Sequence, residues 1–491
     1  MPSVPDDMTA ILPADHDLES SLMLASLEVK VYKRRWWILF LFAGLGFMQC
    51  AVWNTWGPIT ESVKLAYPSW SDAQIALLSM WGTITMILGL IPLTTLLQIK
   101  GIRASLLLTA SFMTIGTAIR CLTEEEQAFR ILAHVGAVFN GFAGIAIGAA
   151  PSMLSSRWFP PNERTTATGI GCTFNQLGNA GGFFLGPLLI RLPKNHTDPG
   201  NSTLPYVHTE VGNRTVSEID DDDIQLLRQG IRDYMFISAG LCAALLIGVI
   251  AYFPSKPPKP PSLTSCISTP APLMEDVKAL LSNKNVWLLV IPYSITLGVN
   301  VAWSSVLDIN VAPFGISQDE ASMMGMYVTF GGVVMALIAA RISDLLFGYM
   351  KLTIICLMVV ATGGFTWFLL IMNECLPYNK VFLFVSVIIG SSFNYACSPL
   401  FFELAVELAY PVSAGVVGGF LTLCWNVVGV IFLLTMQMPM DSVLWMDYIL
   451  AIQGLVVVLL MILVKEEYRR TSIDKVPETQ TTENIPGVEH R

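Results

Sequence analysis

Hydrophobic residues in this chain are grouped into long uncharged blocks that are separated by polar connections. A block of about 20 apolar residues is long enough for a helix to cross a hydrocarbon core of ~30 Å. Such blocks lie at 36–56, 74–97, 103–120, 131–154, 165–190, 233–253, 286–308, 321–342, 351–372, 380–402, 412–436 and 443–464. The pattern predicts an all-α membrane protein with twelve transmembrane helices.

The composition agrees with this prediction and argues against other classes of protein. Hydrophobic residues make up 53% of the 491 residues and charged residues only 13%, whereas soluble domains carry about a quarter charged residues. The net charge of −9 is concentrated in polar connections such as 124–126 and 220–223, so it does not indicate a nucleic-acid partner. The cysteines lack metal-ligand spacing, and no nucleophile elbow or phosphate loop is visible. We therefore expect neither an enzyme nor a bound metal or other cofactor.

Basic residues at the ends of the blocks predict the orientation of the chain. Lys33-Arg34-Arg35 precedes the first block and Trp36-Trp37 begins it, a pattern typical of a cytosolic flank with interfacial aromatic residues. Basic residues recur in the even-numbered connections, at Lys100, Arg103, Arg157, Arg164, Lys256, Lys259, Arg341 and Lys351. Both tails, 1–35 and 465–491, are therefore predicted to be cytosolic. The first tail has no apolar core of a cleavable signal, so the first helix is expected to direct targeting.

The long connection at 191–232 falls on the opposite, lumenal side. It holds three glycosylation acceptor sequences, which begin at Asn195, Asn201 and Asn213. Three such sequences in one loop predict N-glycosylation there.

The N-terminal tail carries a candidate sorting signal. Asp7 is followed four and five residues later by Ile11 and Leu12. This spacing resembles the acidic dileucine signal that clathrin adaptors bind, and it predicts delivery to lysosomes.

The blocks divide into two halves, 36–253 and 285–464, which are joined by a cytosolic linker at 254–284. The proline-rich run at 254–261 predicts a semi-rigid spacer. The halves also resemble each other, because Ala150-Pro151 and Ser398-Pro399 each end a block that leads to a glycine-rich one. Parallel repeats of six helices predict a ligand site between the halves, near the middle of the bilayer.

Several strings resemble solute carrier family 49, the feline leukaemia virus subgroup C receptor-related family of the major facilitator superfamily. They are the segment 52–59 (VWNTWGPI), the segment 175–178 (NQLG), Trp158-Phe159 before Glu163-Arg164, and Phe402-Glu403-Leu404 with Glu407. The resemblance extends over 32–468. It implies a transporter of twelve helices in two pseudo-symmetric halves that works by alternating access.

The resemblance leaves three functions open. The first is a monomeric lysosomal carrier in the bilayer that moves pyridoxine in a proton-dependent manner, which is our expectation. The second is a plasma-membrane carrier of choline, ethanolamine or heme, as implied by other members of the family. The third is a transport-inactive receptor or sensor on the same scaffold.

Three residues of the first half are candidate substrate contacts. Gln49 and Trp53 lie four residues apart on one face of the first helix, and the family resemblance implies that Trp53 stacks on a substrate cation. Gln176 corresponds to a glutamine that faces the substrate in the family. The alternative for each of them is packing between helices, because buried amides form hydrogen bonds across close helices.

The second half offers Asn300, Trp303 and Asn426. Trp303 corresponds to a family tyrosine, and a tryptophan ring is the better cation–π platform. Together with Trp53 it would form an aromatic clamp across the two halves. Asn426 stands where the family has a glutamine.

Four residues are candidates for proton coupling. Asp308 follows Asn300 by two helical turns, and its alternative is an ordinary carboxylate at the lumenal rim. Glu403 and Glu407 lie one turn apart, and they fit a latch between cytosolic loops as well as a proton relay. His134 would titrate near lysosomal pH, or it is a packing histidine with satisfied hydrogen bonds.

One position departs from the family pattern. Gln98 stands in the second-to-third connection where related chains have an aspartate, whereas Arg341 and Asp344 are present in the second half. The cytosolic charge latch of the first half is therefore in doubt.

Overall fold

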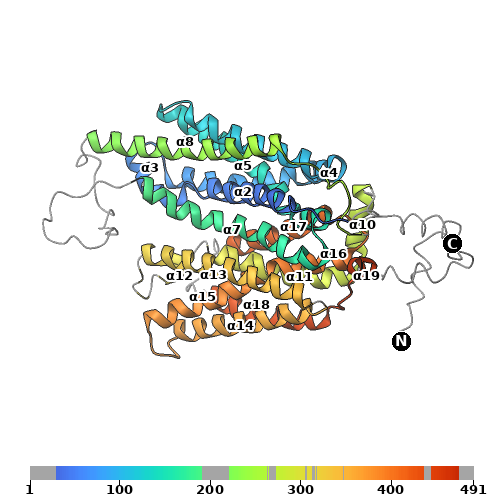
Figure 1. Cartoon of the computed structure of the whole chain (residues 1–491). Coiled ribbons are helices and arrows are strands. Elements are labelled where there is room, and N and C mark those ends of the chain that lie inside the picture. Colours follow the sequence, from blue (N-terminus) through green and yellow to red (C-terminus); the bar gives the residue numbers. More distant parts are fainter. Residues whose placement is uncertain are drawn as a thin grey trace, which may run out of the picture.

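A computed structural model describes residues 29–190, 221–262, 264, 272–304, 307–311, 314, 316, 318–346, 348–435 and 444–474. Within these ranges the regular elements are helices, and no strand occurs. The helices form two bundles, which Figure 1 shows one above the other.

The N-terminal bundle is coloured blue to green in Figure 1. Short turns and helices cap its ends at Gly57–Ile59 (η2), Thr60–Ala66 (α3), Ile119–Cys121 (η3) and Pro161–Glu163 (η4). Its long helices are α2 (Arg35–Trp53), α4 (Asp72–Ala118), α5 (Glu126–Ala149), α7 (Arg164–Leu189) and α8 (Asp221–Ala251), and the short helix α6 (Pro151–Trp158) follows α5.

The C-terminal bundle follows the helix α10 (Leu273–Ser282) of the linker. It consists of α11 (Lys284–Ser304), α12 (Leu307–Val311), α13 (Gln318–Leu345), α14 (Met350–Met372), α15 (Lys380–Ala396), α16 (Ser398–Ala409), α17 (Ala414–Thr435) and α18 (Trp445–Leu463). A short helix, α19 (Arg469–Asp474), comes last.

The twelve predicted spans all correspond to helices. By length and hydropathy, ten described segments could cross a membrane, and one of them, Met80–Cys121, covers most of the predicted span 74–97 and all of 103–120. Gly101 separates these spans, with a φ of 80° that favours glycine over other residues. The twelfth span is α7, whose many glycine and amide residues lower its hydropathy.

Helix α8 begins at Asp221, well before the predicted span at 233. A hydropathy window cannot detect this polar extension, which tertiary contacts hold in place. Arg228 Nε donates to the carbonyl oxygen of Ala66 at 3.0 Å, and Arg232 forms an ion pair with Glu124.

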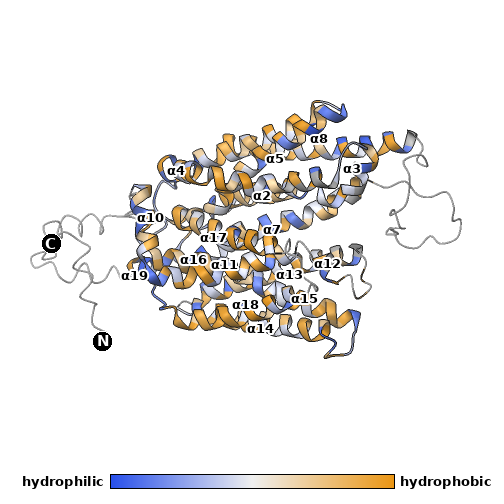
Figure 2. Cartoon of the chain, turned by 180° about the vertical axis from the view of Figure 1, so that it is seen from behind, coloured by the Kyte–Doolittle hydropathy of each residue, from blue (hydrophilic) through white to orange (hydrophobic). Residues whose placement is uncertain are grey.

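Hydrophobic residues predominate along the helices of both bundles (Figure 2), and many large apolar side chains are exposed. Leu88, Ile91 and Leu463 expose 69%, 71% and 64% of their surface. Such exposure would be costly in water, but lipid tails are as apolar as these side chains. The surface is therefore consistent with a membrane environment.

The two bundles meet along α17, which contacts α4 and α5, and along α13, which contacts α7. Thr422 Oγ1 donates to the carbonyl oxygen of Gly148 at 3.2 Å. Gly418 lies directly against the carbonyl of Ala149, so a β-carbon there would collide with the backbone. Small residues thus allow the halves to approach closely.

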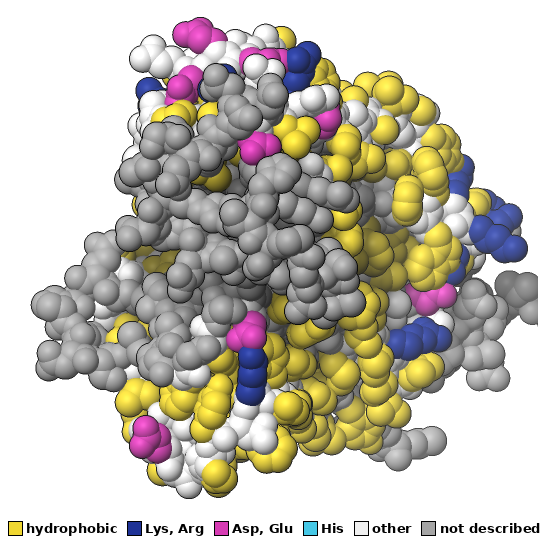
Figure 3. Space-filling model, turned by 90° about the vertical axis from the view of Figure 1, so that its left-hand side faces the viewer, with side chains coloured by type: hydrophobic (Ala, Val, Ile, Leu, Met, Phe, Trp, Pro, Cys, Tyr) yellow, Lys and Arg dark blue, Asp and Glu magenta, His cyan; other side chains and the backbone are white. Residues whose placement is uncertain are grey.

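The molecule has two ends that differ in their chemistry. At the end called here the tail face lie α10, α19 and the start of α2 (Figure 1). Lys30 N donates to the carbonyl oxygen of Pro260 there at 3.0 Å. The opposite end, the far face, carries α3, α12 and η3, and Figure 3 shows acidic and basic side chains at its rim.

Candidate functional site

Trp53 and Asn426 come from different halves and meet the same face of α4. The indole of Trp53 packs directly over Gly82. Asn426 Nδ2 lies 3.4 Å from Met86 Sδ, and it also donates to the carbonyl oxygen of Thr422 at 2.8 Å. Because Gly82 and Met86 are four residues apart, they lie one helical turn from each other. Both candidates are half-buried, and the contact of Asn426 with Met86 crosses from one bundle to the other.

Gln176 on α7 is also half-buried, and no hydrogen bond of its side chain occurs within the described part of the chain. The neighbouring Asn175 points elsewhere, since its Nδ2 donates to Gln49 Oε1 at 3.1 Å and to the carbonyl oxygen of Gly46 at 2.8 Å. Gln176 therefore keeps its amide free for a ligand, whereas Asn175 fastens α7 to α2.

The side chain of Gln49 is buried and holds helices together. It is 4% exposed, and its Nε2 donates to the carbonyl oxygen of Asn140 at 3.4 Å. Asn140 Nδ2 donates in return to the carbonyl oxygen of Gln49 at 3.1 Å. In this conformation Gln49 joins α2, α5 and α7 through its backbone and side chain.

The expected aromatic clamp between Trp53 and Trp303 is not formed in this structure. Trp303 is completely buried in the C-terminal bundle. Its ring packs edge-on against Phe368, with centroids 5.6 Å apart, and its Nε1 donates to Asp447 Oδ1 at 3.4 Å. The indole N–H of Trp303 therefore has its hydrogen-bond partner within the C-terminal bundle. The predicted clamp is wrong for this conformation, and Trp53 alone remains as an aromatic ring for a substrate cation. Asn300 is also completely buried, although its Nδ2 has no partner.

Asp447 is a buried acid that the sequence analysis overlooked. It lies in the first turn of α18 and is fully buried. Asn310 Nδ2 and Trp303 Nε1 donate to its Oδ1, and its Oδ2 has no partner. No cation among the described residues forms an ion pair with it. A lone acid inside the apolar block 443–464 was the available signal, because such residues in a membrane are costly and commonly functional.

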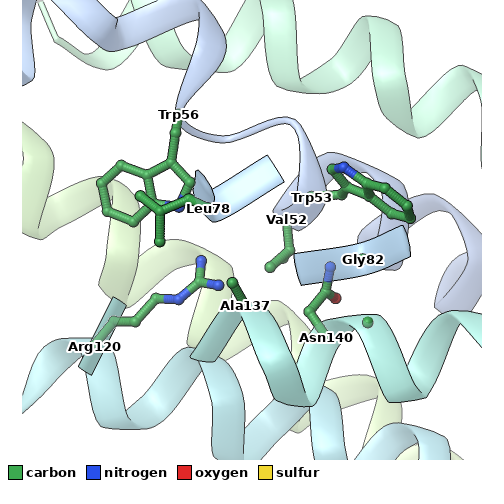
Figure 4. Close-up of a pocket in the computed structure, with 9 residues that line it drawn as sticks. Val52, Trp53, Trp56, Leu78, Gly82, Arg120, Ala137 and Asn140 are labelled. Atoms are coloured by element: carbon green, nitrogen blue, oxygen red, sulfur yellow. The ribbon is translucent and has the colours of Figure 1, made fainter. Parts of the chain in front are cut away.

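Trp53 also lines a small pocket between α2, α4 and α5 (Figure 4). Trp56, Arg120 and Asn140 line it with polar atoms, and Val52, Leu78, Gly82, Ala137 and Gly141 complete it. Arg120 is only 3% exposed. This places a buried positive charge near the candidate platform.

A cluster of buried charges closes the tail face, and we call it the tail-face latch: Arg164, Glu403, Glu407, Arg470 and Asp474. Arg470 Nη2 lies 2.8 Å from Glu403 Oε2, and its Nε lies 3.0 Å from Glu407 Oε1. Burial alone would lower the pKa of Arg470, but the carboxylates of Glu407 and Glu403 outweigh it and raise that pKa. In this conformation the two glutamates therefore hold α19 against α16.

The latch also joins the two halves. Arg164 at the start of α7 pairs with Asp474 of α19, with 2.9 Å between Nη1 and Oδ2. Ser155 Oγ of α6 donates to Glu403 Oε1 at 3.1 Å. Next to the latch, Asp344 of α13 accepts hydrogen bonds from the backbone N–H groups of Thr165 and Thr166, at 3.0 and 2.7 Å. An acid from the second half thus caps a helix of the first.

An aspartate of the linker lies beside Gln98, where related chains have an aspartate in the second-to-third connection. Gln98 Nε2 donates to Asp276 Oδ2 of α10 at 2.8 Å, and Ser413 N lies 3.4 Å from the same oxygen. Burial raises the pKa of Asp276. The linker helix therefore supplies the acid that the first half lacks, which sequence spacing could not reveal.

The remaining candidates are placed only in part. His134 is half-buried, and its Nδ1 accepts a hydrogen bond from Trp81 Nε1 at 3.0 Å. Asp308 belongs to α12, but its side chain lies outside the described residues. Also outside them are the candidate glycosylation and sorting residues Asn195, Asn201, Asn213, Asp7, Ile11 and Leu12.

Comparisons with known proteins agree with this architecture. Residues 36–433 match the Major Facilitator Superfamily model. The Escherichia coli fucose:proton symporter FucP superposes with a TM-score of 0.63 at 14% identity, over 87% of this chain and 98% of the symporter. At that identity the likeness concerns the fold alone.

Among curated proteins, the chain is 33% identical over 452 residues to the solute carrier family 49 member 4 homolog of Xenopus tropicalis. The match covers 91% of this chain and 94% of that protein. It is 27% identical over 423 residues to the choline/ethanolamine transporter FLVCR2 of Homo sapiens, covering 84% of this chain and 73% of the relative. The chain therefore belongs to solute carrier family 49 of the major facilitator superfamily and is a multi-pass membrane transporter.

Proposed function

We propose that this transporter is a lysosomal carrier that moves pyridoxine in a proton-dependent manner by alternating access. The observation that carries the proposal is that Trp53 and Asn426, from different halves, contact α4 one helical turn apart. Trp53 offers an aromatic face, Gln176 offers a free amide, and Asn426 contributes an amide from the other half.

The chemistry of pyridoxine suits such a group. Its pyridine nitrogen gains a proton in an acidic compartment, and a cation held over an indole gains about 0.5–2 kcal/mol. At ~1.4 kcal/mol per decade, this corresponds to about 2- to 30-fold in affinity. The free amide of Gln176 would hydrogen-bond the substrate hydroxyl groups.

Alternating access requires that one end be closed while the other admits substrate. In the proposed orientation the tail face is cytosolic and the far face is lumenal. The buried ion pairs of the tail-face latch then belong to a state that is closed to the cytosol.

The proposal is tested by uptake into vesicles that contain the purified protein. Radiolabelled pyridoxine, choline and heme are offered with and without an imposed pH gradient. We expect pyridoxine uptake that the gradient increases, and that Trp53→Ala weakens most at acidic pH. Uptake of choline or heme without pyridoxine would reject the substrate, and uptake of none would favour a receptor or sensor.

A choline or ethanolamine carrier is the second candidate, because several relatives at 27–28% identity carry that name. A quaternary ammonium is charged at every pH, so the pH dependence separates the two. Trp53→Ala should weaken choline uptake equally at pH 5 and pH 7.5.

The source of proton dependence is tested by Asp308→Asn. We expect it to flatten the pH profile and to abolish uphill transport while substrate binding remains. If concentrative uptake survives, the proton route must be sought at Glu403, Glu407 or His134.

Two experiments test the compartment and the orientation. Ile11→Ala with Leu12→Ala should move the carrier to the cell surface, and unchanged lysosomal staining would reject the sorting signal. Removal of N-linked sugar should reduce the mass of the wild type but not that of the triple variant N195Q/N201Q/N213Q. A mass shift that persists in the variant would contradict the assignment of the glycosylated loop.

A further inference from the structure

Arg120 is a buried charge without a counter-ion among the described residues. It lies in η3 at the far face and is 3% exposed. Its guanidinium lies over the ring of Trp56, 5.7 Å from the centroid. No acidic residue in the described part of the chain forms an ion pair with it. Because a guanidinium stays protonated in proteins, the charge persists and a ring face compensates it only in part.

The pocket beside Arg120 contains polar atoms without partners. They are Arg120 Nε, Trp56 Nε1 and Asn140 Oδ1, and all three are buried. In Figure 4 the side chains of Trp56 and Arg120 face each other across this pocket, with Asn140 on the opposite wall. Its remaining walls include the apolar residues Val52, Leu78 and Ala137. Buried polar groups are rarely left unsatisfied, so the pocket is suited to hold a ligand.

The shape and charge of the pocket limit that ligand. The space has room for about one water-sized particle. Glu124 lines the neighbouring second pocket, where it is more than half exposed and paired with Arg232. Two N–H donors, one of them charged, thus face a small space with apolar walls.

We propose that this pocket binds one small monovalent anion of the size of chloride. Arg120 and Trp56 Nε1 donate hydrogen bonds to it, and its charge neutralises the guanidinium. A second pocket, lined by Arg120, Glu124 and Arg232 among others, shares Arg120 with this one.

The site has a consequence for transport, which rests on the proposed function. Trp53 lines the same pocket, so the charge of Arg120 acts on any cation held by its indole. With the anion absent, Arg120 repels a cationic substrate. With the anion bound, this repulsion is removed, and the carrier becomes anion-dependent.

The direct test measures radiolabelled chloride binding to the purified full-length protein, with gluconate keeping the ionic strength constant. We expect saturable binding of about one chloride per chain, together with a saturable rise of the unfolding temperature. Arg120→Gln should abolish both effects. Chloride binding that is absent in the wild type, or unchanged in Arg120→Gln, would overturn the proposal.

A matched pair of variants distinguishes loss of the anion site from loss of folding. Trp56→Phe keeps an aromatic ring over Arg120 and removes only the N–H donor, so chloride should bind at least several-fold more weakly. Trp70→Phe removes another buried unpartnered indole N–H, 5.5 Å from Trp56 by ring centroids and outside the pocket. It should bind chloride like the wild type. Equal effects of the two substitutions would contradict the site.

Transport separates the two proposals. Pyridoxine uptake should fall at least several-fold when chloride is replaced by gluconate, and Arg120→Gln should remove this dependence. If chloride binds but no pyridoxine is carried, the anion site stands and the proposed function fails. If pyridoxine uptake is the same in both salts, the link between anion and substrate is rejected.

Discussion

The two ends of this transporter differ in whether their buried charged side chains form ion pairs. At the tail face, Arg470 is paired with Glu403 and Glu407. At the far face, Arg120 and Asp447 are buried just as deeply, yet neither forms an ion pair within the described ranges. A buried pair stabilises one arrangement of the helices, whereas a buried single charge remains available to a ligand or a proton. The difference indicates that ion pairs hold the helices together at the tail face. The far face carries buried charged groups that can still bind a ligand or a proton.

The largest expected effect comes from breaking the fastened end. Arg470→Ala leaves Glu403 and Glu407 buried without their cation, which should lower the free energy of unfolding by about 3–5 kcal/mol. Arg469→Ala is the control, because its exposed side chain only pairs with Glu467. Denaturant unfolding in detergent measures both, and equal losses would refute the role of the latch.

The same chemical change should act differently at the two ends. Glu407→Gln removes a carboxylate from a paired arginine and should cost about 1.5–3 kcal/mol of stability. Asp447→Asn removes an acid that pairs with no cation among the described residues, so no charge loses its partner and the effect should stay below about 1 kcal/mol. Parallel unfolding curves at pH 7 compare them. A larger loss for Asp447→Asn would mean that the far face is fastened as well.

A smaller effect is expected at the hydrogen bonds between the halves. Asp344→Ala removes the acceptor of the Thr165 and Thr166 N–H groups and should cost about 0.5–2 kcal/mol, as loss of a helix cap does. Asp344→Asn keeps an acceptor oxygen and should recover part of it. No difference between the two variants would show that the cap contributes nothing.

The smallest effect concerns the linker helix. Burial raises the pKa of Asp276 above its unfolded value of about 3.9. Its contribution to stability is therefore complete below the unfolded pKa and is lost as the pH rises through the folded pKa. Unfolding temperatures between pH 4 and pH 7 should fall slightly more for the wild type than for Asp276→Asn. Parallel curves would contradict this assignment.

Local patterns in the sequence determined a large part of this architecture. Long uncharged blocks located the twelve spans, although the many glycine and amide residues of α7 keep it from reaching the hydropathy of the others. The four-residue spacing of Glu403 and Glu407 placed both acids on one face of a helix. The strings around Trp53 and Gln176 indicated the family, which the comparisons confirmed.

Only the tertiary structure decided which charges have partners. The acids Glu403 and Glu407 are neutralised by Arg470 in the tail, and the acid that position 98 lacks comes from Asp276 in the linker. The indole N–H of Trp303 donates to Asp447, and Trp303 does not face Trp53. Arg120 is buried, and no acid in the described ranges pairs with it. The physical reason is that hydropathy and helical period act over a few neighbouring residues. The partner of a buried charge, by contrast, depends on which distant helices pack against it.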